Sequence, residues 1–214
     1  MHKNWIVLVL IASGVFNCYS QKKAFTHPDF EVLQKSHKTL AIVPILTFWN
    51  GLDFSTQPNQ PKFLEEQAFK TQEILIEYFE NSRKSKLFSI EIQSFKETQQ
   101  KLHNAQISLE ELSRTSPKAL CKVLNVDAVL LGTLRLEAVQ YPNITKETSL
   151  WENLTGKDFI GTLSLKLSDR KTGKLLWKYA QLLAKNNGKT LEQILKDTSK
   201  KIGRKFPYLR RGSD

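Results

Sequence analysis

Histidine and carboxylate side chains are the first candidates for chemistry in this chain, because they supply metal ligands and general acids or bases. The four histidines are scattered along the sequence: His2, His27, His37 and His103. None of them stands at the spacing that places two ligands on one helix face. Glu65–Glu66 and Glu110–Glu111 are adjacent pairs, which point in different directions on a helix. We therefore predict solvated helix faces here, with no metal site, no cofactor and no catalytic residue.

Nucleophilic catalysis has no support from the sequence either. The chain contains nine glycines, and they form neither a Gly-x-Ser-x-Gly turn nor a glycine-rich phosphate loop. Cys121 lies within an apolar pattern with Leu120, Val123 and Leu124, so we predict a buried core residue rather than a reactive thiol. An unrecognised hydrolase stays open as the second alternative for the function.

Cys18 has the clearest chemistry in the sequence, which is covalent attachment to lipid. Lys3 precedes an uncharged apolar run, Trp5 to Val15, of roughly 11 residues, whereas a membrane-spanning helix needs about 20. This pattern predicts a signal peptide. Cys18 follows it directly, with Val15 at −3 and Asn17 at −1, in a relaxed form of the motif whose cysteine receives diacylglycerol. Cleavage after Ser20 is the alternative, and it would release a soluble secreted domain.

The expected location follows from this signal: the protein is exported and held in the periplasm or at the outer membrane by its N-terminal lipid. The formal net charge of +11 then favours acidic partners outside the cytoplasm, such as phospholipid head groups, lipopolysaccharide or wall polymers. Nucleic acid is not expected as a partner in that compartment. The excess charge also fits a purely solubilising role. Two cysteines in the whole chain exclude a disulfide-stapled scaffold.

The first half of the chain predicts two strands and a helix. Residues 21–36 are expected to be a tether and a capping segment, and residues 38–44 a strand that is buried on both faces and ends at a proline. A long loop is predicted for residues 45–62. Residues 63–83 contain no glycine or proline and predict a helix, and residues 88–92 alternate as a half-buried strand.

The second half of the chain predicts helices with clear start signals and three strands. Ser108 with Glu111, Ser116 before Pro117, and Thr190 with Gln193 mark helix starts, and Asn125 marks a helix end. The strands are expected at residues 128–139, 163–167 and 176–182. A long loop is expected at 140–158, and a hairpin turn with Gly173 at 169–174.

Together these elements run in the order β-α-β-α-β-β-β-α. They predict the α/β class: a mixed sheet of about five strands with helices packed on it in two or three layers. We expect a signal peptide at 1–20 (1–17 if Cys18 is lipidated), one α/β domain at 37–208 and a basic, polar tail at 209–214.

Two surfaces are candidates for binding. The two long loops carry aromatic residues that favour a partner surface: Trp49, Phe54, Tyr141 and Trp151. The alternative is that these rings fold back onto the sheet. The last helix carries a basic face that would adhere to an anionic surface, with about 1 kcal/mol for each basic residue near the membrane. Its residues are Lys200, Lys201, Arg204 and Lys205, and a merely solvated face is the alternative.

Four motifs carry a resemblance to known proteins: His37–Pro44 (HKTLAIVP), Leu124–Gly132 (LNVDAVLLG), Thr172–Tyr179 (TGKLLWKY) and Lys205–Tyr208 (KFPY). With them the chain resembles a group of small exported bacterial proteins of unknown function. More remotely it is similar to the domain shared by the curli-secretion lipoprotein, the lipoprotein activators of penicillin-binding proteins and the N-terminal domain of the Tol propeller protein. Asn125 stands where those families have glycine, and this chain lacks their long pore hairpins and long linkers.

The resemblance implies an assembly or accessory role in the cell envelope, without catalysis. The leading expectation is therefore a non-enzymatic, membrane-tethered lipoprotein that contacts an envelope protein of unknown identity. A binding module for an anionic lipid head group or glycan is the first alternative. A homo-oligomer stays open as the assembly state.

Overall fold

The computed structural model describes residues 24–50, 60–84, 88–138, 159–184 and 189–208. Cys18, Phe54, Tyr141, Trp151, the signal segment and the tail at 209–214 lie outside these residues. Seven strands of the described chain form one sheet: β1 (Ala24–Thr26), β2 (Thr39–Ile42), β3 (Leu46–Asn50), β4 (Glu91–Ile92), β5 (Ala128–Ala138), β6 (Phe159–Asp169) and β7 (Leu175–Ala184). The helices are α1 (Phe30–Leu33), with a 3₁₀ turn at Gln34–Ser36, α2 (Gln60–Lys84), α3 (Phe95–Asn104), α4 (Leu109–Arg114), α5 (Pro117–Leu124) and α7 (Leu191–Gly203).

The sheet is mixed, which confirms the predicted α/β class. Its strand order is β1-β7-β6-β5-β2-β4, and β3 also pairs with β5, following β2 along the same edge. The three long strands β5, β6 and β7 are antiparallel neighbours, whereas β2 and β3 run parallel to β5.

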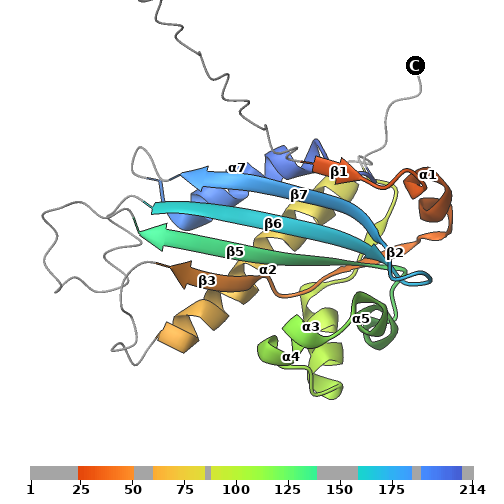
Figure 1. The fold of residues 1–214 in the computed structure, drawn as a ribbon, viewed down its shortest axis with the longest axis horizontal. Coiled ribbons are helices and arrows are strands. Elements are labelled where there is room, and N and C mark those ends of the chain that lie inside the picture. Colours follow the sequence, from red (N-terminus) through yellow and green to blue (C-terminus); the bar gives the residue numbers. More distant parts are fainter. Residues whose placement is uncertain (1–23, 51–59, 85–87, 139–158, 185–188, 209–214) are drawn as a thin grey trace, which may run out of the picture.

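Helices cover the two faces of the sheet unequally (Figure 1). Helices α2 and α7 lie behind the long strands and bury the larger core against one face, which we call the covered face. Helices α3, α4 and α5 pack on the opposite face, but only at the end formed by β2 and the start of β5, where they enclose a second, smaller core. The remainder of that opposite face, over β5, β6 and β7, carries no helix of the described chain, and we call it the uncovered face.

The prediction of a loop at residues 45–62 is wrong at both ends of this range. Residues 46–50 form β3, and α2 already begins at Gln60. Pro44 does not end the pairing, because the chain resumes it after a one-residue bulge: Ile42 lies opposite Leu130, and Leu46 opposite Thr133. The bulge turns Ile45 into the larger core, where its backbone N–H donates to the Ala68 carbonyl of α2 at 3.1 Å.

The predicted helix signals are confirmed in detail. Ser108 and Thr190 form capping boxes with Glu111 and Gln193, and Ser116 caps α5 ahead of Pro117. Asn125 ends α5 in the left-handed conformation, with φ of 52°. Helix α3 was not predicted from the sequence, although Ser94, whose side chain accepts from the Glu97 amide, marks its start by the same rule.

The segment expected as tether and cap contributes an edge strand and a helical turn. Ala24, Phe25 and Thr26 pair with Tyr179, Lys178 and Trp177 of β7. Phe30 at the start of α1 is fully buried against Tyr208, with ring centroids 5.3 Å apart. Both ends of the described chain therefore pack on the same part of the sheet.

Candidate functional site

A buried polar network contains a histidine and an aspartate, the pair that assists the nucleophile in a catalytic triad, together with a tyrosine. His37 Nε2 lies 2.9 Å from Asp169 Oδ1, and His37 Nδ1 lies 2.5 Å from the Tyr208 hydroxyl. Because an ionised carboxylate only accepts hydrogen bonds, Nε2 carries the ring proton, and the Tyr208 hydroxyl then donates to Nδ1. The network joins the segment just before β2, where His37 lies two positions ahead of Thr39, to the end of β6 and the C-terminal end of the domain.

The surroundings of this network give it a structural role. Burial alone would raise the pKa of Asp169, but hydrogen bonds from the Thr172 hydroxyl and amide, and from His37, together hold it below its usual value. Burial also raises the pKa of Tyr208 far above neutrality, so its hydroxyl stays protonated. Side-chain exposure is 2% for His37 and 1% for Asp169, so a substrate cannot reach either group.

A second carboxylate fixes the neighbouring chain. Asp127 Oδ2 accepts from the backbone amides of Lys38 and Thr39, at 2.8 and 3.1 Å, and from the Thr39 hydroxyl. Burial tends to raise the pKa of Asp127, yet these hydrogen bonds lower it on balance. The Asp127 side chain thereby ties the start of β5 to the start of β2.

Other candidates for chemistry in the described residues are also structural or absent. Cys121 is buried, as predicted, and burial raises the pKa of its thiol to about 12, so no thiolate forms near neutral pH. The described part of the chain holds no cluster of three or more His, Cys, Asp or Glu side chains placed to bind a metal ion. No helix within it combines the length and apolar character needed to cross a bilayer.

The uncovered face is the surface with the most unusual composition. Residues directly opposite one another on neighbouring strands share a face, so the strand register defines its side chains. From β1 to β3 they form rows across the sheet: Phe25, Lys178 and Lys166 in one, Ala180, Ser164 and Thr133 in the next, Leu182, Thr162, Arg135 and Phe48 in the third, and Ile160 with Glu137 in the fourth.

Large apolar side chains are exposed around the border of this face. The exposed fractions are 44% for Phe25, 40% for Phe48, 46% for Ile160 and 59% for Leu182. Only one other large apolar residue of the described chain is exposed, Val32 on α1. Single exposed apolar residues are ordinary, but four on one sheet face mark an interaction surface.

The same face also carries three cations of the described chain. The Arg135 guanidinium lies 5.1 Å above the Phe48 ring, in a cation–π contact. Lys166 and Lys178 stand directly opposite each other on β6 and β7. No carboxylate of the described residues forms an ion pair with any of these three cations. The face therefore combines exposed apolar side chains with three cations, which lie in the rows on either side of the neutral row of Ala180, Ser164 and Thr133.

The like-charged pair yields a stability prediction. Replacing Lys178 by Glu turns a repulsive cross-strand pair into an attractive one, so we expect Lys178→Glu to raise the free energy of unfolding by about 0.5 kcal/mol. Lys171→Glu, in the exposed turn after β6, is the matched control and should change it by less. Urea unfolding at low salt measures both variants, and a destabilised Lys178→Glu protein would contradict the assigned register.

An apolar groove adjoins the uncovered face at β3. It has a volume of about 830 Å³, lies open to solvent, and is lined by β3, the first half of α2, and α3 with α4. A smaller hollow of about 410 Å³ continues from it onto the sheet, where Thr133, Arg135, Ser164 and Lys166 line it. Phe48 lines both. The groove and the face are therefore one continuous surface.

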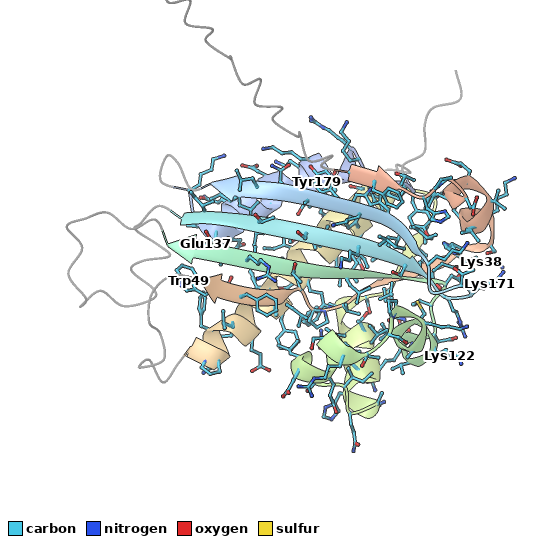
Figure 2. The ribbon with its side chains drawn as sticks, in the orientation of Figure 1. Lys38, Trp49, Lys122, Glu137, Lys171 and Tyr179 are labelled. Carbon is cyan, nitrogen blue, oxygen red and sulfur yellow. The ribbon has the colours of Figure 1, made fainter. Side chains whose placement is uncertain are left out.

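The predicted site residues lie in three different places. Trp49 is in β3, half-buried on the covered side, so its neighbour Phe48 presents the exposed ring. Figure 2 shows Trp49 and Glu137 at the end of the sheet opposite to Lys38, Lys122 and Lys171. The four basic residues predicted on the last helix are all exposed, and Lys200 lies 3.5 Å from Asp197. Helix α7 ends at Gly203, however, so Arg204 and Lys205 follow it rather than belonging to its face. Phe54, Tyr141 and Trp151 are outside the described residues.

Comparison with known proteins finds similar folds only. No family model matches the sequence, and no curated protein matches it. Lipoprotein GNA1162 from Neisseria meningitidis is 16% identical, over 78% of this chain and 96% of that chain, with a TM-score of 0.44. LpoB from E. coli is 13% identical, over 77% and 67%, with a TM-score of 0.43. The PelC dodecamer from Paraburkholderia phytofirmans is 11% identical, over 78% and 86%, with a TM-score of 0.41. At these identities the likeness assigns no functional residue.

Proposed function

We propose that this chain is an exported, non-enzymatic accessory protein of the cell envelope, tethered through a lipid on Cys18, which binds another envelope protein through its uncovered face. The observation that carries the proposal is the clustering of exposed apolar side chains on that face. Four of the five large ones in the described chain border it: Phe25, Phe48, Ile160 and Leu182. A partner that covers this face would bury them.

A lipid on Cys18 would hold the domain close to the membrane. Residues 19–23 separate Cys18 from Ala24, where β1 begins, and a fully extended chain of this length reaches at most about 22 Å. The end of α7 lies near β1, because Phe206 packs edge-on against Trp177, which pairs with Thr26. We propose that the basic cluster at the end of α7, formed by Lys200 and Lys201 in the helix and by Arg204 and Lys205 just after it, contacts anionic head groups as a second attachment signal.

The mature N-terminus gives the test of the tether. We expect mass spectrometry of the protein isolated from membranes to find a chain that begins at Cys18 and carries the added mass of acyl chains, because the cysteine follows the apolar signal directly. The purified soluble fraction provides the comparison. A mature chain that begins at Gln21 would exclude lipid attachment and leave a secreted domain.

Leu182→Asp tests the partner surface. The substitution places a charge within the exposed apolar border of the face, and Leu182 is exposed, so the domain should still fold while captured partner falls by about tenfold or more. The matched control is Val32→Asp, the same apolar-to-acidic type of change at the exposed apolar residue that lies off the face. Crosslinking in the envelope followed by affinity purification measures both. Equal capture by the two variants would contradict docking on this face.

A second candidate function is binding of an anionic envelope ligand, a lipid head group or a glycan. The observation that favours it is the presence of three cations on the uncovered face, Lys166, Lys178 and Arg135, with which no carboxylate of the described residues forms an ion pair. This candidate requires the domain without its lipid to bind vesicles containing anionic phospholipid in a strongly salt-dependent way, and Lys178→Glu to weaken that binding. Binding that resists salt and survives the substitution would exclude it.

A further inference from the structure

Positive charge gathers at the end of the sheet where β5 begins and where a turn joins β6 to β7. Figure 2 shows Lys38, Lys122 and Lys171 at this end. They come from three separate parts of the chain, namely the residue before β2, helix α5 and the β6–β7 turn. Six cations of these segments form a cluster that we call the basic end: Lys38, Lys118, Lys122, Arg170, Lys171 and Lys174.

Close contacts hold these segments together. A Cβ on Gly173 would lie 3.7 Å from Lys118 Cβ, so the β6–β7 turn packs against the first turn of α5. The backbone N–H of Arg170 donates to the Asp127 carbonyl at 2.9 Å, and Asp127 Oδ2 accepts from the Lys38 amide. The six cations therefore share one surface, although almost 140 residues separate the first from the last.

The carboxylates of the described residues leave most of this charge unpaired. Asp127 accepts from backbone amides, and Asp169 is buried against His37. Lys174 lies 4.0 Å from the exposed Asp29, and no carboxylate of the described residues forms an ion pair with the other five cations. Like charges gathered on one surface repel one another and attract anions, so the basic end fits an anionic partner.

From this surface we propose that the basic end rests on an anionic phospholipid membrane and thereby orients the tethered domain. The end of the sheet that carries Trp49 and Glu137 then points away from the membrane (Figure 2). The uncovered face stands at the side, where a partner can reach it. The inference rests on the proposed tether at Cys18, and it names the surface of the domain that faces the lipid.

The length of the tether allows this contact. Ala24 lies opposite Tyr179, which is four residues from the start of β7 at Leu175, or about 13 Å along the strand. The extended chain between Cys18 and Ala24 reaches at most about 22 Å. The lipid anchor can therefore hold the basic end at the surface in which it is embedded, and the attachment raises the effective concentration of head groups there.

The second attachment signal points toward the same end. Tyr208 follows the basic cluster at the end of α7, and its hydroxyl is hydrogen-bonded to His37, the residue before Lys38. The chain after α7 therefore runs toward the basic end. Both basic surfaces can face one membrane together.

The kind of cation favours a membrane over a single phosphorylated ligand. Five of the six cations are lysines, whose flexible side chains act as point charges and suit a diffuse anionic surface. Arginine forks suit one phosphate held in a fixed geometry. The only arginine of the basic end, Arg170, is directed toward the protein, with Nη1 3.3 Å from Asn125 Oδ1.

Vesicle binding tests the basic end without help from the lipid. The mature chain from residue 18, carrying Cys18→Ser, is mixed with vesicles of phosphatidylcholine, alone or with phosphatidylglycerol. We expect binding to the anionic vesicles only, weakened by salt. Lys122→Glu and Lys171→Glu should each weaken binding by about fivefold or more. Lys62→Glu, which changes the net charge equally at the exposed start of α2, should weaken it by less than about twofold.

A second measurement reads the orientation of the lipidated protein on the anionic vesicles. A fluorophore attached at Ser36→Cys, two residues before Lys38, should be quenched by head groups that carry a quencher. The same fluorophore at Glu65→Cys should not, because α2 begins at the opposite end of the sheet (Figure 1). Cys121 is buried and will not take the label.

Several results would overturn the inference. Equal binding to neutral and anionic vesicles would do so, as would equal losses in Lys122→Glu and Lys62→Glu, which report net charge alone. A loss confined to Lys178→Glu would move the contact to the uncovered face. Binding of dextran sulfate without binding of anionic vesicles would assign the basic end to a soluble polyanion.

Failure of the tether and failure of the basic end give different results. A mature chain that begins at Gln21, with vesicle binding that is still lost in Lys122→Glu, would contradict the tether and support the membrane-facing surface. A lipidated chain whose vesicle binding and orientation are unchanged in Lys122→Glu and Lys171→Glu would leave the proposed function intact and contradict this inference.

Discussion

Replacing Asp169 by alanine is expected to lower the free energy of unfolding by about 3 kcal/mol, because it breaks a buried, fully hydrogen-bonded group. The substitution leaves the His37 ring N–H without an acceptor in the interior and removes the carboxylate that holds the Thr172 amide and hydroxyl. The three parts of the chain joined by His37, Asp169 and Tyr208 would then lose their common attachment.

Chemical denaturation measures this effect, with Asp29→Ala as the matched control. Asp29 is also an aspartate near a histidine, but its side chain is 59% exposed and its contacts with His27 and Lys174 span 3.8 and 4.0 Å. Exposed pairs of this kind contribute at most about 1 kcal/mol, so Asp29→Ala should have a small effect. Similar losses in the two variants would contradict a structural role for the buried network.

The same carboxylate predicts a pH dependence. The folded pKa of Asp169 lies below its ordinary value, so the native state binds fewer protons than the unfolded state as the pH falls. Its contribution is therefore complete above the unfolded pKa, which is about 3.9, and disappears as the pH falls through the lower folded value. We expect stability to decline below about pH 4 in the wild type, and less steeply in Asp169→Asn.

Gly132→Ala is the second large effect we expect, with a loss of about 2 kcal/mol through overpacking. A Cβ at this position would lie 2.6 Å from Ile45 Cδ1 and 2.8 Å from Leu165 Cδ2, and both neighbours are fully buried. Ile45 occupies this place because the bulge before β3 turns it into the core.

A double-mutant cycle with Ile45→Val separates this contact from a general effect on β5. Ile45→Val removes the methyl group that meets the new Cβ, so the double variant should lose less stability than the two single variants added together. Unfolding in urea supplies all three values. Strict additivity would show that Ile45 does not fill the space at Gly132.

Local signals account for the parts of the fold that the sequence predicted correctly. The capping residues Ser108, Ser116 and Thr190 act on backbone groups within the same helical turn, and Gly173 adopts a φ of +70° in a turn of its own hairpin. None of these features depends on a distant part of the chain. They are therefore visible in a single sequence.

Strand β3 was not predicted from the sequence because its pairing is long-range. Its partner β5 follows more than 80 residues later, and the bulge at residues 43–45 breaks the apolar pattern that would connect β3 with β2. Unless β3 is recognised as a strand, the sequence does not show that Phe48 and Trp49 point to opposite faces of the sheet. Trp49 was therefore predicted to be the exposed ring, whereas the structure shows that Phe48 is exposed and that Trp49 is half-buried.

The uncovered face could not be predicted from the sequence either. Its residues come from five strands, and their exposure depends on α3, α4 and α5 covering only one end of the sheet. In β6 and β7 the pattern shows which side chains alternate outward, but not whether a helix covers them. Leu182 and Ile160 are accordingly indistinguishable from core residues in the sequence alone.

Site-specific photocrosslinking in living cells tests the central claim most directly. A photoreactive phenylalanine analogue replaces Leu182 or Phe48 on the uncovered face, or Val32 off it, and the crosslinked products are separated by mass. We predict one discrete heterologous product from the first two positions and none from Val32. A product from Val32 alone, or equal products from all three positions, would contradict docking of an envelope partner on this face.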